Sequence, residues 1–366
     1  MAKKGTVRLD GVEWDFASLW GNAFSCYPER LAQKRDYIYA SEIGGSFRDR
    51  YLKMFAHPFS NPFNQRSKAK MMAGRFFEDV VGLVLSGTGM LKERQQRVRV
   101  ELPGCLLVSG KLDFVAGGTI DWEEAERKAA EVKRLFMASS FETSDFICHM
   151  IDHILPHFKN VFGANPAREY VLEAKSVSGF VFNLIDASNK PRQNHPLQLL
   201  TYLIPKDTPK HGMLQYISRE DVQMRDFLIL PEAALLKQYH DDVQTMTMYY
   251  NNAGKNYLKN LPPLEPEVIF EEASCRFVKS NGVEYSSYLT YNYGYSNIDE
   301  FKAKWDSRLS KWNRVFKRAA KGETITKANI EIINDAKTVF PNWDELVFQA
   351  KEAGAFQVDE PEDAEV

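Results

Sequence analysis

The sequence reads Glu-Tyr-Val-Leu-Glu-Ala-Lys over residues 169–175, an apolar strand pattern that ends in two charged side chains. Side chains two positions apart on a strand point to the same face, so Glu173 and Lys175 lie side by side. Such a pair can be a structural ion pair. It can also be half of a hydrolytic site, in which the carboxylate binds a hard cation and the ammonium orients water or stabilises phosphoryl charge. The stretch therefore predicts a strand over 169–177 with one of these roles at its end.

A second acid, Asp113, occurs in an apolar setting upstream, three residues after Gly110. We expect a strand over 105–116, which places Asp113 among core side chains. A carboxylate buried there is costly unless it is paired or bound to a metal. Asp113 is therefore a candidate ligand for the same cation that Glu173 would bind.

Two further pairs of residues lie at helical spacing. A helix predicted over 67–85 carries Gly74 and Glu78 one turn apart, on the side away from its apolar row. The glycine permits close approach of another element, and Glu78 is either an ordinary solvated residue or a further metal ligand. Gln198 and Tyr202 are likewise one turn apart on a second predicted helix. The apolar row of the first helix consists of Met72, Phe76, Phe77, Val80 and Val84.

The rest of the pattern alternates between strands and helices. Residues 179–185 are predicted to pair back on the preceding strand as a hairpin that turns at Gly179. Further strands are expected at 95–102, 212–218 and 225–230, and further helices at 47–56 and 231–252. This arrangement predicts an α/β core with helical additions at both ends.

Taken in order, these elements resemble the PD-(D/E)XK nuclease superfamily, and specifically its RecB-like exonuclease branch. That branch combines a helical Gly-x-x-x-His/Glu with Gly-x-x-Asp, Glu-x-Lys and Gln-x-x-x-Tyr. The matching pairs here are Gly74 with Glu78, Gly110 with Asp113, Glu173 with Lys175, and Gln198 with Tyr202. Residues 212–219, Gly-Met-Leu-Gln-Tyr-Ile-Ser-Arg, also fit the strand that commonly follows in that family. The resemblance covers residues 41 to 270 and implies a restriction-endonuclease-like core, in which helices flank a central mixed β-sheet.

The resemblance also implies a metal site. Asp113 and Glu173 would hold one or two Mg²⁺ or Mn²⁺ ions. The Glu78 carboxylate and the Ala174 backbone carbonyl would assist them. Lys175 would position or activate the attacking water.

An activity follows from the same resemblance. Gln198 and Tyr202 would orient the site or grip the DNA backbone. The expected protein is a metal-dependent DNA nuclease, in first place an exonuclease that acts on DNA ends in replication, recombination or repair. The alternatives are a structure-selective or ligand-activated endonuclease and a non-catalytic DNA-binding protein derived from a nuclease.

The sequence departs from the family at the cysteines that clamp an iron–sulfur cluster in many members. Ser46 stands at the early cysteine position, and the late element at 287–295 contains no cysteine. Cluster ligation needs several thiolates, so we expect no iron–sulfur cluster. Nearby, Arg48 is a candidate for phosphate contact or for a structural role. His195, three residues before Gln198, is a candidate for phosphate contact or for starting its helix.

The connection between the two acidic motifs is far longer than a hairpin needs. We therefore expect a helical insertion over residues 121–165, which would cap the cleft, divide the strands or bind a partner. Within it, His149, His153 and His157 recur every four residues. They could ligate zinc if the helix continued. However, Pro156 is expected to end the helix, which favours surface or capping histidines.

We expect four regions. The resemblance implies the nuclease-like core at 67–260. It is preceded by an N-terminal helical region at 1–66 and followed by a mainly helical region at 261–350 and an acidic tail at 351–366 that we expect to be disordered. The third region contains a basic helix, 301–321, in which eight Lys or Arg residues occur with one acid. Its basic face either contacts phosphates or is an ordinary solvated face over an aromatic core. The expected core stripe is Phe301, Trp305, Leu309, Trp312 and Phe316.

The overall composition narrows the setting. The 366 residues are 44% hydrophobic, which is ordinary for a soluble protein. No apolar run reaches the roughly 18–20 residues of a membrane span, so we expect no membrane partner. Four scattered cysteines and the lack of a secretory signal favour the cytoplasm. DNA is the expected partner, and because the chain lacks a P-loop, any unwinding motor would be a separate helicase or recombination protein.

Overall fold

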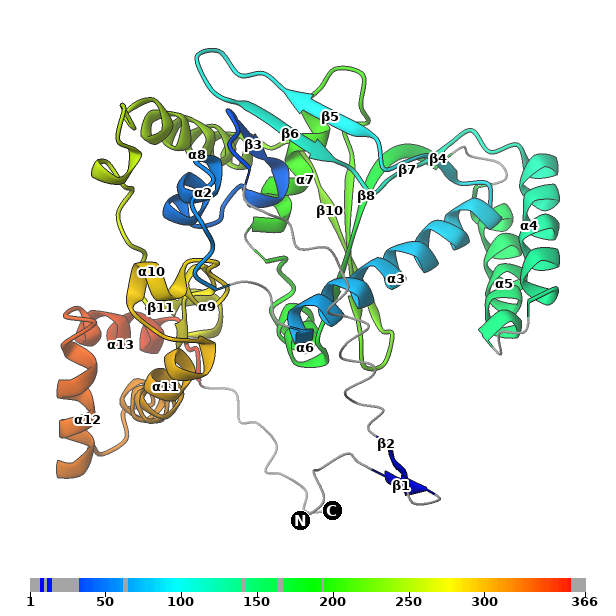
Figure 1. Cartoon of the computed structure of the whole chain (residues 1–366). Coiled ribbons are helices and arrows are strands. Elements are labelled where there is room, and N and C mark those ends of the chain that lie inside the picture. Colours follow the sequence, from blue (N-terminus) through cyan, green and yellow to red (C-terminus); the bar gives the residue numbers. More distant parts are fainter. Residues whose placement is uncertain are drawn as a thin grey trace. The chain divides into compact units, whose positions relative to one another are not determined.

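The computed structural model describes residues 7–9, 12–14, 33–61, 65–139, 143–162, 167–192 and 194–356 (Figure 1). The chain divides into two compact units. Unit 1 comprises Met1–Pro58 and Phe63–Pro262, and unit 2 comprises Phe59–Pro62 and Pro263–Val366. The protein belongs to the α/β class, as the sequence predicts. Among the described residues, no helix is both long and apolar enough to cross a membrane.

A five-stranded sheet forms the centre of unit 1. Its order is β10–β9–β8–β7–β4, in which β8 and β9 are parallel and the other neighbours are antiparallel. The strands are β4 (Leu91–Arg94), β7 (Phe114–Gly118), β8 (Ala167–Val177), β9 (Gly212–Ser218) and β10 (Met224–Ile229). The central strand β8 pairs Leu172 with Phe114 on one side and Lys175 with Tyr216 on the other. The strand predictions for β8, β9 and β10 are confirmed.

The crossover from β8 to β9 is helical, so the predicted hairpin at 179–185 is wrong. It contains α6 (Gly179–Ser188) and α7 (Asn194–Leu203). Parallel neighbours require such a crossover, and both edges of β8 are already occupied by β7 and β9. Phe182 and Ile185 are buried at helical spacing, but a short apolar run does not by itself separate a helix from a strand. In α7, every residue from Pro196 to Leu203 is buried, so this helix lies within the core.

Helix α3 (Gln65–Gly87) packs against β8 and β4. Its buried anchors are Val81 and Leu85, in the C-terminal half. The predicted apolar side is wrong in the first half, where Met72 is 41% and Phe76 is 61% exposed. Helical spacing identifies residues that share a face, but it does not show how much of that face another element covers.

Unit 1 also contains a three-stranded sheet with the order β3–β6–β5, and the two sheets share one hydrophobic core. Its strands are β3 (Tyr37–Tyr39), β5 (Arg97–Val100) and β6 (Leu107–Lys111). The single strand predicted over 105–116 is therefore wrong, because β6 and β7 belong to different sheets. The Leu112 amide donates to the Gln96 carbonyl, 3.0 Å away. The Gln95 amide donates to the Asp113 carbonyl, also at 3.0 Å, so both segments turn at the same place.

A helical hairpin separates β7 from β8, where the insertion was predicted. It consists of α4 (Trp122–Met137) and α5 (Thr143–Phe162). The expectation that Pro156 ends the second helix is wrong, because α5 continues through it. Proline removes one backbone hydrogen bond, but Ile151 and Leu155 anchor the turn before it against α4. Packing therefore holds the helix together across the break.

The helix that precedes α3 packs against the last α-helix of unit 1. Helix α2 (Phe47–Met54) packs against α8 (Ala233–Asn251). Arg50 is almost fully buried and forms a two-pronged ion pair with Asp242, at 2.7 and 2.9 Å. Outside this region, β1 (Val7–Leu9) and β2 (Val12–Trp14) form an antiparallel pair.

Unit 2 is built around one long helix, α11 (Ile298–Ala320). The surrounding elements are β11 (Val268–Glu271), β12 (Arg276–Lys279), α9 (Asn281–Glu284), α10 (Leu289–Tyr293), α12 (Lys327–Lys337) and α13 (Trp343–Glu352). All five residues of the predicted aromatic and apolar stripe on α11 are buried, which confirms it as core. Phe277 of β12 stacks on Trp343 of α13, with ring centroids 5.0 Å apart. Unit 2 therefore has its own hydrophobic core.

The basic side of α11 is partly neutralised within unit 2. Lys302 pairs with Glu284 at 3.4 Å, and Arg308 pairs with Asp335 at 2.7 Å. Glu267 accepts from the Trp305 indole at 2.6 Å and from Lys304 at 3.1 Å, and also from the Tyr295 hydroxyl. This half of the predicted basic face therefore serves the unit's own structure.

Candidate active site

The two predicted acids meet where the two sheets of unit 1 join. Asp113 lies in the turn between β6 and β7, and Ala174 lies on β8 just beyond the last β7–β8 pair. The Ala174 amide donates to Asp113 Oδ2 at 3.1 Å. Because the N–H and C=O of one strand residue point to the same neighbour, the Ala174 carbonyl also points towards the Asp113 side. The break in the predicted strand is thus what brings Asp113 to the end of β8.

Glu173 is the most buried charged group of the site, with 2% of its surface exposed. One of its oxygens, Oε1, accepts hydrogen bonds from Lys175 Nζ and, at 2.6 Å, from Gln198 Nε2. The other oxygen, Oε2, is buried and has no hydrogen-bond partner among the described residues. A buried acceptor without a partner costs about 1–3 kcal/mol, and more when it is charged. Glu173 is therefore only half satisfied by the protein.

The charges of the site oppose one another. Burial, reinforced by the nearby Glu173 carboxylate, raises the pKa of Asp113 to about 8, although Lys175 offsets part of the effect. Burial by itself lowers the pKa of Lys175, but the negative charges of Glu173 and Asp113 outweigh it, and the net pKa is raised. The lysine is thus held as an ammonium between two carboxyl groups that repel each other.

Glu78 approaches the same group from α3. Burial raises its pKa, while Arg94 lowers it and Glu173 raises it further. Its side chain accepts a hydrogen bond from Gln95 Nε2. The backbone amide of the same Gln95 donates to the backbone carbonyl of Asp113, so Gln95 connects Glu78 to the turn that carries Asp113.

Gln95 was not found by sequence analysis, and no sequence pattern marks it. It occupies the turn between β4 and β5 with a φ of 57°, in the left-handed region. Only the folded arrangement of the two sheets brings this turn beside α3.

The residues Gln198 and Tyr202 point inwards and brace the site. Gln198 holds Glu173, as described above, and Tyr202 donates to the Lys111 carbonyl at 3.2 Å. A Cβ atom on Gly110 would lie 2.6 Å from the Tyr202 ring and 2.7 Å from Ala40. Gly110 is therefore required for the tyrosine to pack. By contrast, a Cβ atom on Gly74 would make only an ordinary contact, 3.5 Å from the Ser176 hydroxyl, so the close approach predicted there is not enforced.

His195 lies near the ammonium but is held as a neutral ring. Its Nδ1 is 2.8 Å from the Tyr216 hydroxyl. Burial lowers its pKa well below the ordinary value, and the charges of Lys175 and Arg192 lower it further. Tyr216 already accepts from the Arg192 amide at 3.0 Å. The Tyr216 hydroxyl can therefore donate a hydrogen bond to His195 Nδ1. The neutral His195 ring then carries its proton on Nε2, which is a donor.

Arg48 has a structural contact. It donates to the Pro262 carbonyl at 3.2 Å, where unit 1 ends. Its neighbour Ser46, at the position of the family's early cysteine, accepts from the Asp49 amide at 3.2 Å and thereby caps α2. The structural role predicted for Arg48 is thus seen in this contact, and its phosphate contact stays a prediction.

In the described part of the chain, no three His, Cys, Asp or Glu side chains converge closely enough to hold a metal ion as they stand. In α5, His149 and His153 contact each other at 3.0 Å between their Nε2 atoms, and both are exposed. At the acidic site, Glu78 is turned towards Gln95 and Glu173 Oε1 is held by its two donors, so the carboxylates do not yet converge.

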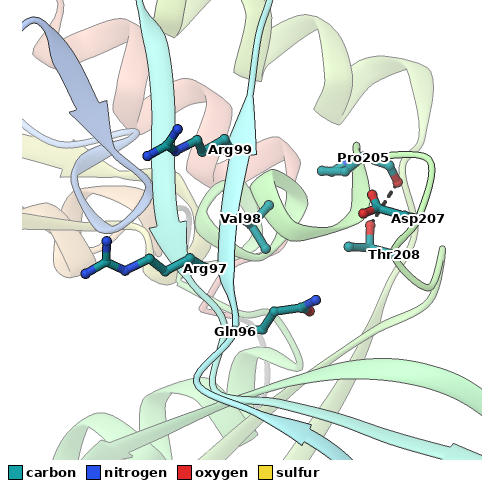
Figure 2. Close-up of a pocket in the computed structure, with 7 residues that line it drawn as sticks. All are labelled: Gln96, Arg97, Val98, Arg99, Pro205, Asp207 and Thr208. Atoms are coloured by element: carbon teal, nitrogen blue, oxygen red, sulfur yellow. Dashed lines mark hydrogen bonds between the residues drawn. The ribbon is translucent and has the colours of Figure 1, made fainter.

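Figure 2 shows a small hollow elsewhere in unit 1, between β5 and the segment 205–208. It encloses about 80 Å³ and is lined by Gln96, Arg97, Val98, Arg99, Pro205, Asp207 and Thr208. None of the predicted site residues contributes to it.

Comparison with known proteins gives little. No protein-family model matches the chain, and no curated protein matches it. Among solved structures it is similar to one described as "Crystal structure of SSO0001", with 13% sequence identity and a TM-score of 0.33. The alignment covers 62% of this chain and 83% of that chain. A TM-score this low does not establish a shared fold.

Proposed function

We propose that this protein is a metal-dependent DNA nuclease that hydrolyses phosphodiester bonds, in first place an exonuclease acting on DNA ends. The observation that carries the proposal is the half-satisfied Glu173. One oxygen is held by Lys175 and Gln198, while the other is buried without a partner. In a purely structural ion pair such an oxygen would cost stability without any return, whereas a bound cation would satisfy it. An arrangement of this kind is typical of a site that awaits a ligand.

We further propose that the five-stranded sheet is a restriction-endonuclease-like core. In support, the sheet is mixed, and α3 and α7 both pack against β8. Of the expected motif, Asp113 directly precedes β7, and Glu173 and Lys175 lie near the end of β8. The helical hairpin α4–α5 is then an insertion between these two strands.

The donor set fits a hard divalent cation. Glu173 Oε2, the Asp113 carboxylate and the Ala174 carbonyl would hold Mg²⁺ or Mn²⁺, because such ions prefer oxygen ligands. Glu78 would join them on leaving Gln95. When bound, an ion of this kind polarises the phosphate and makes a coordinated water more acidic.

The chain's own residues supply the remaining chemistry. The Lys175 ammonium orients the attacking water and stabilises the negative charge that builds on the phosphoryl oxygens. Gln198 fixes Glu173 through Oε1 and so keeps Oε2 available. Tyr202 holds the Lys111 carbonyl and thus the turn that carries Asp113. The neutral His195 adds a hydrogen-bond donor close to Lys175.

The test is cleavage of end-labelled linear and covalently closed DNA, single- and double-stranded, with Mg²⁺, Mn²⁺ or EDTA. Wild type is compared with Asp113→Ala and Lys175→Ala. Lys237→Ala, which removes an exposed lysine of α8, is the matched control. An exonuclease is supported if wild type degrades linear DNA in a metal-dependent way and neither Asp113→Ala nor Lys175→Ala does. Nicking of closed circles with the same sensitivity favours the endonuclease. DNA binding without any cleavage favours a non-catalytic protein.

A further inference from the structure

The sheet β3–β6–β5 has one buried face and one exposed face. Arg97 is paired with Lys111 and Arg99 with Ser109, and residues paired across strands share a face. On β3, Tyr39 is also paired with Ser109. Figure 2 shows Arg97 and Arg99 extending to one side of β5 and Val98 to the other. The residues of the opposite face, Ile38, Val98, Val100 and Val108, are buried in the core of unit 1. The outer face therefore consists of Tyr37, Tyr39, Arg97, Arg99 and Lys111.

This outer face carries positive charge that the protein does not neutralise. Arg97, Arg99 and Lys111 are exposed, and within the described residues none of them forms an ion pair. Arg97 also lies directly opposite Lys111, and like charges at such positions are destabilising. Two other arginines of unit 1 do form ion pairs, Arg35 with Glu42 and Arg94 with Asp79. Three exposed cations without an ion-pair partner among the described residues point to an anionic ligand on the outer face.

The same face presents aromatic rings. Tyr39 is 42% exposed. It meets Tyr37 edge to face, with ring centroids 5.2 Å apart and the two hydroxyls 3.0 Å apart. The Arg35 guanidinium lies 4.2 Å from the Tyr39 ring centroid and supports it from one side. Exposed rings beside unpaired cations on a sheet favour unstacked bases, because the rings stack on bases while the cations contact the phosphates. A duplex does not offer its base faces in this way.

The outer face leads directly to the acidic site. Lys111 is the last residue of β6, and Asp113 follows it by two positions. The Tyr202 hydroxyl of α7 donates to the Lys111 carbonyl and so fixes the segment between Lys111 and Asp113. We propose that the outer face of β3–β6–β5 binds single-stranded nucleic acid and directs the strand to the site at Asp113 and Glu173. The delivery rests on the proposed nuclease function, whereas the binding does not.

The binding test uses the full chain and fluorescein-labelled oligothymidine in EDTA, so that cleavage plays no part. Arg97→Gln combined with Arg99→Gln should weaken binding about 10-fold and reduce the slope of log affinity against log salt by about 1.4, since each phosphate contact contributes about 0.7. Tyr39→Leu should weaken oligothymidine binding about 5-fold or more through lost stacking. It should leave binding of a duplex of equal length unchanged.

The matched control is Lys237→Gln combined with Lys351→Gln, which removes two exposed cations from α8 and α13. It should change binding less than twofold. A loss in this control equal to that of the Arg97→Gln and Arg99→Gln double variant would overturn the proposal, as would a Tyr39→Leu effect of equal size on the duplex. Circular dichroism of each variant separates lost contacts from lost folding. If wild type binds oligothymidine through this face but cleaves nothing with Mg²⁺ or Mn²⁺, the surface stands and the nuclease proposal fails.

Discussion

Two carboxylates, Glu173 in unit 1 and the half-buried Glu267 in unit 2, show opposite kinds of environment. Glu267 in unit 2 accepts from Tyr295, Trp305 and Lys304. Burial alone would raise its pKa, but these hydrogen bonds outweigh it and the net pKa is lowered. In unit 1, Glu173 keeps an oxygen without a partner and helps to raise the pKa of Asp113 to about 8.

The difference separates a carboxylate whose hydrogen bonds stabilise its unit from carboxylates that the protein leaves partly unsatisfied. Glu267 is surrounded by donors within unit 2. At Asp113 and Glu173 a raised pKa and an unpartnered acceptor cost stability, which the metal ion of the proposed active site would recover. The clusters should therefore respond in opposite ways when each is perturbed.

The largest expected effect separates activity from stability. Asp113→Asn should reduce the cleavage rate by at least about 10²-fold, since it removes a group expected to act on the reacting phosphate. It should not lower the free energy of unfolding in EDTA, because asparagine cannot ionise beside Glu173, whereas the aspartate can. Cleavage assays and urea unfolding of the same preparation measure both. Glu267→Gln should leave the cleavage rate within about twofold, and a comparable rate loss there would break the distinction.

The reverse change tests unit 2. Glu267→Gln should lower the free energy of unfolding of this unit by about 1–3 kcal/mol, because it weakens three hydrogen bonds to a charged acceptor. Tryptophan fluorescence follows the loss, since Trp305, Trp312 and Trp343 lie in this core. The control is Asp306→Asn, which removes an exposed partner of Lys279 and should cost less than about 1 kcal/mol. Equal losses in the two variants would show that the Glu267 cluster has no special weight.

A pair of glycine substitutions tests how tightly the site is packed. Gly110→Ala should destabilise unit 1 by about 1–3 kcal/mol, because the new Cβ collides with both Tyr202 and Ala40. Gly74→Ala should instead be neutral or stabilise by about 0.5–1 kcal/mol, since alanine is the better helix residue and the space is free. Urea unfolding of the two variants decides the matter. Similar losses at both positions would contradict the packing described here.

The last comparison is the pH dependence of stability in EDTA. The folded pKa of Asp113 is raised to about 8, above the unfolded value of about 4, so its contribution is fully present below pH 4 and is lost as pH rises to 8. The lowered pKa of Glu267 acts the other way, and its contribution is lost as pH falls below about 4.5. The melting temperature of wild type minus that of Asp113→Asn should therefore decrease as pH rises from 4 to 8. The corresponding difference for Glu267→Gln should increase as pH rises from acid values to about 4.5 and then stay constant. A flat first difference would refute the raised pKa.

Sequence patterns predicted the elements whose burial is set by their own residues. The alternation in β8 and the helical stripe of α11 both match the structure, because each follows from one buried face. The misses depend on partners distant in the chain. The break at Leu112 is set by Gln96, and the exposure of Phe76 depends on how much of α3 is covered.

The candidate site divides in the same way. The motif residues Asp113, Glu173 and Gln198 do lie together, because the strand and helix that carry them were placed from local patterns. Gln95 could not be predicted, since a turn residue acquires its role only when two sheets meet beside α3. The contact of Arg48 with Pro262 is likewise set by the return of the chain after α8.

The path of the chain between the units has a practical consequence. Phe59–Pro62 belongs to unit 2, although the chain on either side of it belongs to unit 1. Asn61 is held there by the Ser287 carbonyl at 3.0 Å and by the Thr290 amide at 2.8 Å. A cut after Pro262 would thus leave one strip of unit 2 on the larger fragment, with its hydrogen-bonding partners on the smaller one. That boundary is suited to fragment complementation, in which two separately made pieces reassemble, and unsuited to excision of a self-sufficient domain.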